Sequence, residues 1–240
     1  MKITPLEQVL YRGHSATPCP YLPGREANLM FLNGSPNPTV YRTLLDSGYR
    51  RYGQYMYRPD CDGCRECQIL RVPTETFTRS KEQRRIWNRG QREFQWETGL
   101  AEYSDERLDL YRRYLREQHQ SSEADSVDEE QYCAFFVDSF LGGTAFEVRL
   151  YSEDHLVGVG ILDALPDALS SVYFYFDPNY ARLSPGTFSA LLEIDIARAA
   201  GLPYYYLGYY IEACPSMSYK ARFRPCEIKG CDAQDWNVVD

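Results

Sequence analysis

The sequence predicts a mixed α+β or α/β protein, with a largely antiparallel sheet packed by helices and a smaller, mixed, cysteine-bearing N-terminal domain. Three strand-like runs at 144–152, 156–164 and 170–177 are joined by the short segments EDH and LPDA, which suit antiparallel hairpins. A capped apolar helix over 184–200 follows them, and a tyrosine-rich run at 204–211 is a further predicted strand. Strands followed by a helix and another strand indicate a sheet covered by helices.

The N-terminal part contains a predicted helix, two strands and the start of a basic helix. The run TVYRTLLDSG over 39–48 has the pattern of a short helix that ends at a glycine cap. Tyrosine-rich and apolar runs over 49–59 and 69–77 are predicted strands on either side of a cysteine loop. The next helix begins at Ser80, where Gln83 completes a capping box.

Two further helices are predicted before the three strands. The run over 104–119 is amphipathic, and Ser126 with Glu129 forms a second capping box ahead of an apolar helical pattern. The run YKARFRP, residues 219–225, is predicted as a last strand.

The resulting order is helix, helix, three antiparallel strands, helix and strand, which is the element order of the GNAT acyltransferases. We therefore expect two domains. Residues 1–100 would form an N-terminal domain with the cysteine loop and the basic helix, and residues 101–240 a C-terminal GNAT-like domain.

The composition is that of a globular protein without a membrane segment. Hydrophobic residues make up 44% of the 240 residues and charged residues 25%, which disfavours disordered and membrane classes. No run approaches the roughly 20 apolar residues of a membrane helix, and the N-terminus lacks a signal-peptide core. We expect a cytoplasmic protein, in which the 8 cysteines are thiols, metal ligands or redox groups before disulfides.

The net charge of −8 hides an asymmetry along the chain. Residues 1–100 contain 15 basic and 10 acidic side chains, whereas residues 101–200 contain 7 basic and 19 acidic ones. A negative average argues against nucleic-acid binding, but binding depends on local charge. The sum therefore does not exclude a nucleic-acid partner.

The segment RSKEQRRIWNRGQR is a candidate nucleic-acid surface. Its single acid is Glu82, and two aromatic residues, Trp87 and Phe94, accompany the cations. Basic side chains interleaved with aromatic ones suit a phosphate backbone, whereas the alternative is an ordinary solvated helix face. The six cations of this candidate surface are Arg79, Lys81, Arg84, Arg85, Arg89 and Arg92.

The cysteine loop CDGCRECQ has the spacing of a metal site. Cys61, Cys64 and Cys67 are each separated by two residues, and Cys19 lies upstream as a candidate fourth ligand. Four thiolates would complete a zinc or iron–sulfur shell. The alternative is a reduced, structural cysteine loop.

The predicted last strand carries cations at alternate positions. A period of two places Lys220, Arg222 and Arg224 on one face, where they need water or an anion. The alternative is an edge strand that uses charge against aggregation. The helix that begins at Pro185 could hold an acyl carbonyl, but its single Gly186 lacks the glycine pattern of coenzyme A enzymes.

Five long motifs between residues 14 and 236 resemble those of one enzyme family. They are CPYLPGREANL, YRPDCDGCRECQILRVP, RSKEQRRIWNR, VYFYFDPNYARLSPGTFSALLEIDIAR and GLPYYYLGYYIEACPSMSYKARFRP. Together they closely resemble the bacterial aspartate/glutamate leucyltransferases, relatives of the eukaryotic arginyl-tRNA–protein transferases.

The resemblance implies a function and its partners. A GNAT-like enzyme would move leucine, or arginine, from a charged tRNA to the N-terminal amine of proteins that begin with Asp or Glu, creating a degradation signal. Leucyl-tRNA and such proteins would be the partners, and transfer would require no cofactor. The eukaryotic relatives are associated with an iron–sulfur cluster, whereas the cysteine spacing here differs.

The resemblance also assigns roles to residues. The cations Lys220, Arg222 and Arg224 would hold the acceptor's carboxylate, while the basic helix would bind tRNA. The candidate catalytic residues lie near the predicted strand ends and are Tyr209, Glu212 and Tyr219. Two alternative functions are a GNAT acetyltransferase of a small amine and a non-catalytic metal or redox sensor built on the cysteine loop.

Overall fold

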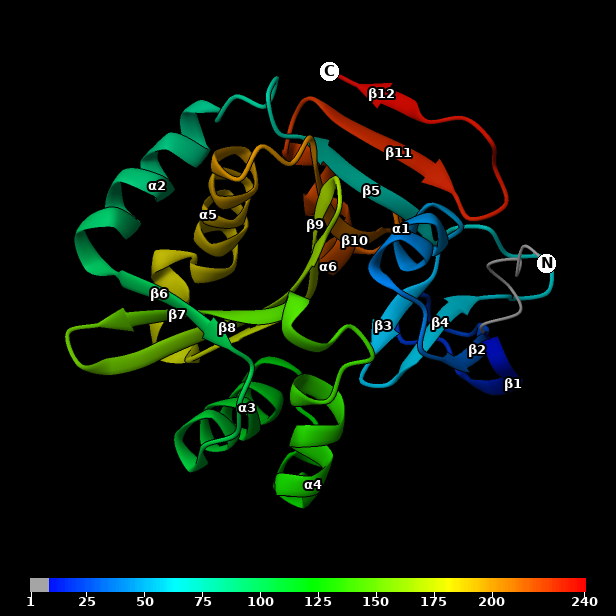
Figure 1. Cartoon of the computed structure of the whole chain (residues 1–240). Helices are drawn as coiled ribbons and strands as arrows, with labels where there is room; N and C mark the ends of the chain where they lie inside the picture. Colours follow the sequence, from blue (N-terminus) through cyan, green and yellow to red (C-terminus); the bar gives the residue numbers. More distant parts are fainter. Residues whose placement is uncertain (1–8) are drawn as a thin grey trace.

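The computed structural model describes residues 9–240, which form two β-sheets flanked by helices (Figure 1). The strands of the smaller sheet are β1 (Val9–Pro18), β2 (Glu26–Gly34), β3 (Arg50–Tyr52) and β4 (Tyr55–Pro59). Their order is β1-β2-β4-β3, with antiparallel neighbours throughout. The single strand expected over 49–59 is a hairpin instead, because Gly53, at φ +57°, turns the chain back between β3 and β4.

The larger sheet has eight strands in the order β12-β11-β5-β10-β9-β8-β7-β6. Their bounds are β5 (Gln68–Pro73), β6 (Gln95–Leu100), β7 (Ala145–Ser152), β8 (His155–Leu165), β9 (Ala168–Phe176), β10 (Tyr204–Tyr210), β11 (Cys226–Gly230) and β12 (Asn237–Val239). The three antiparallel strands expected in the second half are confirmed as β7, β8 and β9.

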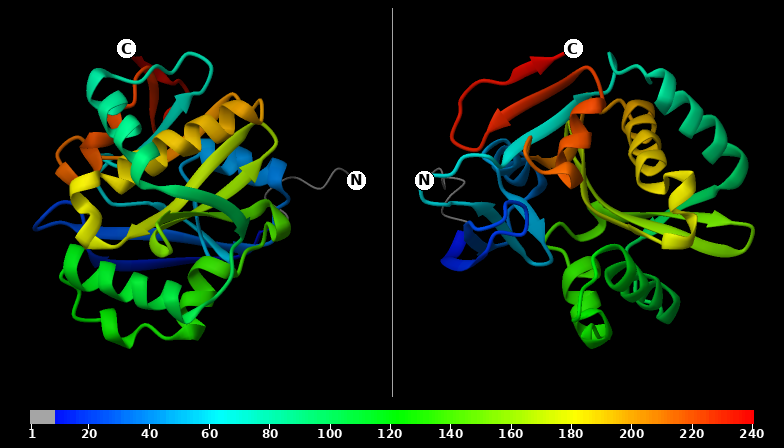
Figure 2. Two further views of the ribbon diagram at one scale, coloured as in Figure 1. Left: turned by 90° about the vertical axis from the view of Figure 1, so that its left-hand side faces the viewer. Right: turned by 180° about the vertical axis from the view of Figure 1, so that it is seen from behind.

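Helices cover both faces of the larger sheet. They are α1 (Pro38–Asp46), α2 (Lys81–Glu93), α3 (Asp105–Gln118), α4 (Glu129–Tyr132), α5 (Pro185–Ala199) and α6 (Pro215–Ser218). Short helical turns are η2 (Ala124–Ser126), η3 (Cys133–Val137), η4 (Gly142–Thr144), η5 (Pro178–Leu183) and η6 (Tyr219–Arg222). Figure 2 shows α2 and α5 on one side of the sheet and α3 on the other, where it packs in a separate aromatic cluster.

The two sheets do not divide the chain at residue 100. β5, α2 and β6 precede that boundary, yet both strands pair within the larger sheet and α2 packs against α5. β5 lies between β10 and β11, and four successive residues from Ile69 to Val72 are buried, as in a strand covered on both faces. The smaller sheet therefore uses only the chain up to Pro59.

The strand expected over 219–225 is wrong. Pro215 begins a helical turn in which the Ser218 amide donates to the Cys214 carbonyl at 2.7 Å, and η6 continues it through Arg222. Phe223, 1% exposed, then anchors the chain in the core ahead of β11. The alternation of YKARFRP was misleading because one helical turn also brings apolar residues four apart to the same side.

The capping box expected at Ser126 and Glu129 is also wrong. Asp128 and Gln131 form it instead, and they begin the short helix α4. The boxes at Ser80 and Gln83, by contrast, are confirmed at the start of α2.

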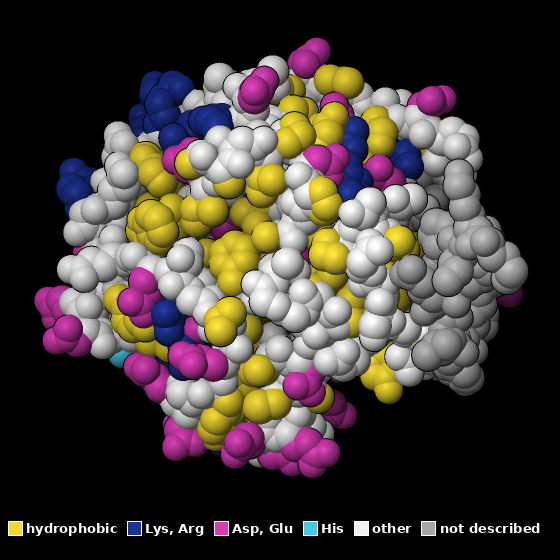
Figure 3. Space-filling model, in the orientation of Figure 1, with side chains coloured by type: hydrophobic (Ala, Val, Ile, Leu, Met, Phe, Trp, Pro, Cys, Tyr) yellow, Lys and Arg dark blue, Asp and Glu magenta, His cyan; other side chains and the backbone are white. Residues whose placement is uncertain are grey.

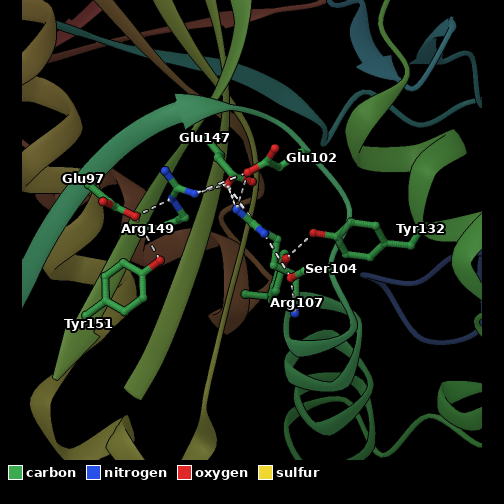
Figure 4. Close-up of polar contacts among 9 residues, drawn as sticks. Glu97, Glu102, Ser104, Arg107, Tyr132, Glu147, Arg149 and Tyr151 are labelled. Carbon is green, nitrogen blue, oxygen red and sulfur yellow. Dashed lines mark hydrogen bonds and ion pairs between the residues drawn. The ribbon is translucent and has the colours of Figure 1, made fainter. Parts of the chain in front are cut away.

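A buried ionic network joins α3 to the edge of the larger sheet (Figure 4). Glu147 of β7 is fully buried and accepts hydrogen bonds from Arg107 of α3, the shorter at 2.6 Å, while Arg149 lies 3.4 Å away. Burial raises the pKa of the Glu147 carboxyl, and the two guanidinium groups oppose that rise.

Within residues 9–240, no helix is long and apolar enough to cross a membrane.

Candidate functional site

The parallel strands β9 and β10 part within the larger sheet. Their pairing covers only three residues of each strand and ends where Ser170 faces Tyr206. Beyond it the register of β10 shifts, and Gly208 adopts φ +93°, a conformation that disfavours any side chain. Ligands of open α/β sheets bind beyond the carboxyl ends of strands where neighbouring strands diverge. The parting of β9 and β10 is therefore the first place to examine for chemistry.

Arg50 of β3 reaches this parting from the smaller sheet. Its side chain is buried, and Nη2 donates to the carbonyl of Ser171, the first β9 residue beyond the paired segment. Its Nη1 is buried and has no hydrogen-bond partner among the described residues. A buried guanidinium nitrogen without an acceptor is costly, so this atom is directed to a ligand or to water.

Lys220 reaches the same place from η6, the helical turn that comes after β10 in the chain. Its Nζ donates to the carbonyl of Tyr209 at 2.8 Å. Burial and, to a smaller extent, the nearby Arg50 lower the pKa of the ammonium to about 7, and Cys214 opposes this shift.

The two cations meet at Gly208. A Cβ atom placed on that glycine would lie 3.4 Å from Lys220 Nζ and 3.8 Å from Arg50 Nη2. Within the described chain, neither cation forms an ion pair with a carboxylate, whereas the adjacent Arg51 pairs with Asp163 at 2.9 Å, both fully buried. The arrangement can therefore accept an anion.

The other two cations predicted to share a face with Lys220 are separated from it. Arg222 is exposed, and its carbonyl accepts a hydrogen bond from Gln83 Nε2 of α2 at 3.1 Å. Arg224 is also exposed and donates from Nε to the carbonyl of Ala221 at 3.1 Å. The shared strand face is wrong because a helical turn points residues two apart in different directions.

The three candidate catalytic residues occupy different environments. Tyr209 is buried, and its hydroxyl donates to the carbonyl of Gly48 at 2.6 Å, so it links β10 to the smaller sheet. Burial raises the pKa of Tyr219 to about 12. Glu212 is exposed in the loop that follows β10.

A carboxyl group that the sequence did not single out lies under the sheet near Tyr219. Glu193 of α5 is buried, and it accepts hydrogen bonds from Ser189 at 2.6 Å and Tyr205 at 2.5 Å. Burial raises its pKa to about 7, and the two hydroxyl donors oppose that rise. Because Glu193 lies on an apolar helix, the sequence gave no sign that its carboxyl group is buried and has a raised pKa.

The basic helix α2 presents an exposed cationic surface. The Gln83 side chain completes the cap at Ser80, and Arg79 forms an ion pair with Asp195 of α5 while stacking over Trp87. Arg84 donates to the carbonyl of Arg79 at 2.6 Å. No ion pair to a described carboxylate is formed by the remaining cations of the set, which are Lys81, Arg85, Arg89 and Arg92.

Figure 3 shows one group of Lys and Arg side chains at the upper left, over α2, and a second at the upper right, whereas the acids lie mainly at the lower end, over α3 and α4. Beside the basic surface, an apolar groove of about 350 Å³ lies between α2, α5 and β6, and Trp87, Phe94 and Trp96 are among its lining residues. The charge asymmetry seen along the sequence is therefore also an asymmetry in space.

The cysteines of the loop lie near one another. Burial and four neighbouring thiols together raise the pKa of the Cys67 thiol to about 12; the four are Cys231, Cys61, Cys19 and Cys64. Cys231, which the sequence pattern missed, has its sulfur 3.3 Å from the Cys67 carbonyl. Among the side chains that the structure describes, no three of His, Cys, Asp or Glu are grouped closely enough to hold a metal ion.

Two family models match the chain. The arginine-tRNA-protein transferase N-terminal model matches residues 17–85, and the C-terminal model matches residues 106–230. The chain belongs to this family. These matches divide the chain near residue 100, although the sheets do not.

Curated relatives cover nearly the whole chain. An aspartate/glutamate leucyltransferase from Chromohalobacter salexigens is 38% identical over 224 residues, covering 91% of this chain and 88% of the relative. One from Nitrosococcus oceani is also 38% identical and covers 92% of both chains. One from Pseudomonas aeruginosa is 34% identical over 228 residues, covering 94% and 96%.

Solved structures support the fold class. The L-PGS structure from Bacillus licheniformis has a TM-score of 0.51 at 15% identity and covers 85% of this chain and 79% of its own. The C-terminal domain of a putative lysylphosphatidylglycerol synthetase from Agrobacterium fabrum also has a TM-score of 0.51 at 15% identity, covering 68% and 58%. The expected GNAT-like acyltransferase fold is confirmed.

Proposed function

We propose that this protein transfers leucine from leucyl-tRNA to the N-terminal amine of proteins that begin with Asp or Glu, in the cytoplasm, and so creates a degradation signal. The observation that carries the proposal is the similarity to aspartate/glutamate leucyltransferases over nearly the whole length of both chains. The exposed basic surface of α2 and the two unneutralised cations at the parting of β9 and β10 support it, since both substrates are anionic.

The reaction requires little beyond positioning. The acceptor's amine attacks the ester carbonyl of the aminoacyl-tRNA, a C–N bond forms, and the C–O bond to the ribose breaks. The amine's proton leaves as the ribose oxygen gains one. An α-amine has a pKa near 8 (about 7.7–8.0), so roughly a tenth of it is already deprotonated at pH 7, and correct orientation can lower the barrier by about 7–11 kcal/mol.

The α2 surface suits the tRNA backbone. Lys81, Arg85 and Arg92 are exposed, and neither they nor Arg89 are engaged by described acids, so they are available to phosphates. Each phosphate contact releases counterions and makes binding weaker as salt rises. Arg79 and Arg84 have partners within the protein and act mainly by holding the helix in place.

The surroundings of the three candidate catalytic residues reduce the number that could transfer a proton. The Tyr209 hydroxyl is committed to the Gly48 carbonyl, so we assign it a positioning role. Tyr219 and Glu212 remain candidates to orient the amine or to protonate the leaving oxygen, because they follow β10 at the parting. No cofactor is needed for these steps.

The test supplies purified protein with leucyl-tRNA or arginyl-tRNA and peptides that begin with Asp, Glu or Ala. Mass spectrometry should show addition of one leucine to the Asp and Glu peptides only. Arginine addition would correct the donor. No addition from either tRNA would overturn the proposal, and a parallel reaction with acetyl-CoA tests the acetyltransferase alternative.

A further inference from the structure

We propose that Arg50 and Lys220 together bind the side-chain carboxylate of the acceptor's first residue and thereby select Asp and Glu. This inference rests on the proposed function. It adds Arg50, which no sequence pattern indicated, and it separates Lys220 from Arg222 and Arg224.

The first argument is the missing counter-charge. Four arginines are buried in the described chain, and three of them have a carboxylate partner: Arg51 pairs with Asp163, Arg71 with Glu227 and Arg107 with Glu147. Arg50 is the exception, and its Nη1 lacks any hydrogen-bond partner there. A buried charge that the fold leaves unpaired is costly unless a ligand supplies the opposite charge.

The second argument is convergence. Two cations from distant parts of the chain approach one point beside Gly208, at 3.4 Å and 3.8 Å from the position of an added Cβ. Backbone carbonyls of Ser171 and Tyr209, one on each parting strand, hold them there. Two like charges repel each other, so the fold holds these two cations together at a cost in free energy. A bound anion would offset that cost.

The third argument concerns which anion fits. The exposed cations on α2 suit the phosphates of a tRNA, whereas in this pair Arg50 is buried and Lys220 is half-buried. A carboxylate is small and planar, and a guanidinium binds it well. The ammonium of Lys220 sits on a flexible stem, which lets one subsite accept both the shorter Asp and the longer Glu.

The test is the discrimination between a carboxylate and its neutral amide. We would measure kcat/KM for peptides that begin with Glu and with Gln, using the wild type, Lys220→Met and Lys220→Arg, and determine the affinity for leucyl-tRNA of each. Lys220→Met should reduce the Glu-over-Gln preference at least tenfold and leave tRNA affinity within twofold. Lys220→Arg, which keeps a cation, should retain most of the preference.

A second, conservative variant, Arg50→Lys, guards against misfolding of the first. Direct binding measurements make the test independent of turnover. Calorimetry with the dipeptides Glu-Ala and Gln-Ala, without tRNA, should show the same loss of preference in Lys220→Met and a smaller loss in Arg50→Lys. Arg116→Gln, an exposed arginine on α3, serves as the matched control.

Each outcome decides between the proposals. An unchanged Glu-over-Gln ratio in Lys220→Met overturns the carboxylate subsite while the transfer reaction stands. A fall in tRNA affinity with an unchanged ratio assigns the pair to the tRNA instead. A wild type that modifies neither Asp nor Glu peptides removes the proposed function and this subsite with it.

Discussion

Replacing Lys220 by Met tests the electrostatics of the site in the protein without substrate. The half-buried Lys220 side chain lies beside Arg50 of β3, with Cys214 and the Tyr209 carbonyl as its other polar neighbours. Its pKa is about 7 in the folded protein and 10.5 in the unfolded chain. Because the unfolded chain binds the proton more tightly, folding at neutral pH carries a penalty that methionine lacks.

The penalty has a definite pH dependence. Between pH 7 and 10.5 the unfolded wild type holds more protons than the folded one, so wild-type stability rises with pH in that window. Linkage with these two pKa values gives a cost of about 4 kcal/mol at pH 7 and about 1 kcal/mol at pH 9.5. The lost hydrogen bond to Tyr209, worth about 1–3 kcal/mol, opposes the gain similarly at both pH values.

The free energy of unfolding, measured by urea denaturation at pH 7 and pH 9.5, checks this. The stability of Lys220→Met relative to the wild type should fall by about 3 kcal/mol as the pH rises from 7 to 9.5. Lys81→Met, which removes an exposed lysine of α2, should show no such change. If the stability difference between Lys220→Met and the wild type is the same at both pH values, the pKa of Lys220 is not lowered by folding.

Other variants test separate parts of the account. Reversing Arg85 and Arg89 to Glu should weaken tRNA binding and lower the salt slope of log Kd by about 0.7–0.9 for each lost phosphate contact; an unaltered slope would count against the α2 surface. Gly208→Ala should cost about 1 kcal/mol because of its positive φ, and should reduce Glu-over-Gln preference although both cations remain; unchanged preference would place the ligand elsewhere. Arg51→Met should lower the free energy of unfolding by about 3–5 kcal/mol, because it leaves the buried Asp163 unpaired; a loss below 1 kcal/mol would contradict that.

The structure also connects the two proposed substrate sites. Gln83 of α2 accepts from the Ser80 amide and donates to the Arg222 carbonyl, so one side chain caps the basic helix and anchors η6. Lys220 lies in that same turn. The orientation of the acceptor site is thus fixed directly against the helix that is proposed to bind tRNA.

Local patterns in the sequence were sufficient for much of the fold. The capping box of α2 and the three antiparallel strands depend on nearby residues, and they were predicted correctly. The strand prediction failed at YKARFRP. Tyr219 and Phe223 fit both the alternation of a strand and the spacing of a helix, and only the helical turn that begins at Pro215 decides between the two.

The site was less predictable because it depends on distant contacts. Arg50 and Arg51 are adjacent and chemically identical, yet Arg51 forms an ion pair with Asp163, whereas Arg50 donates to a carbonyl of β9, more than a hundred residues away. No local pattern distinguishes them. Lys220 was singled out for its charge, whereas its low pKa follows from burial that the sequence does not reveal.

The most direct measurement is a crystal structure of the protein with a bound peptide that begins with Glu. The side-chain carboxylate should lie within about 3.2 Å of both Arg50 Nη1 and Lys220 Nζ, beside Gly208. A carboxylate bound instead at Arg222, at Arg224 or on the exposed face of α2 would contradict the account.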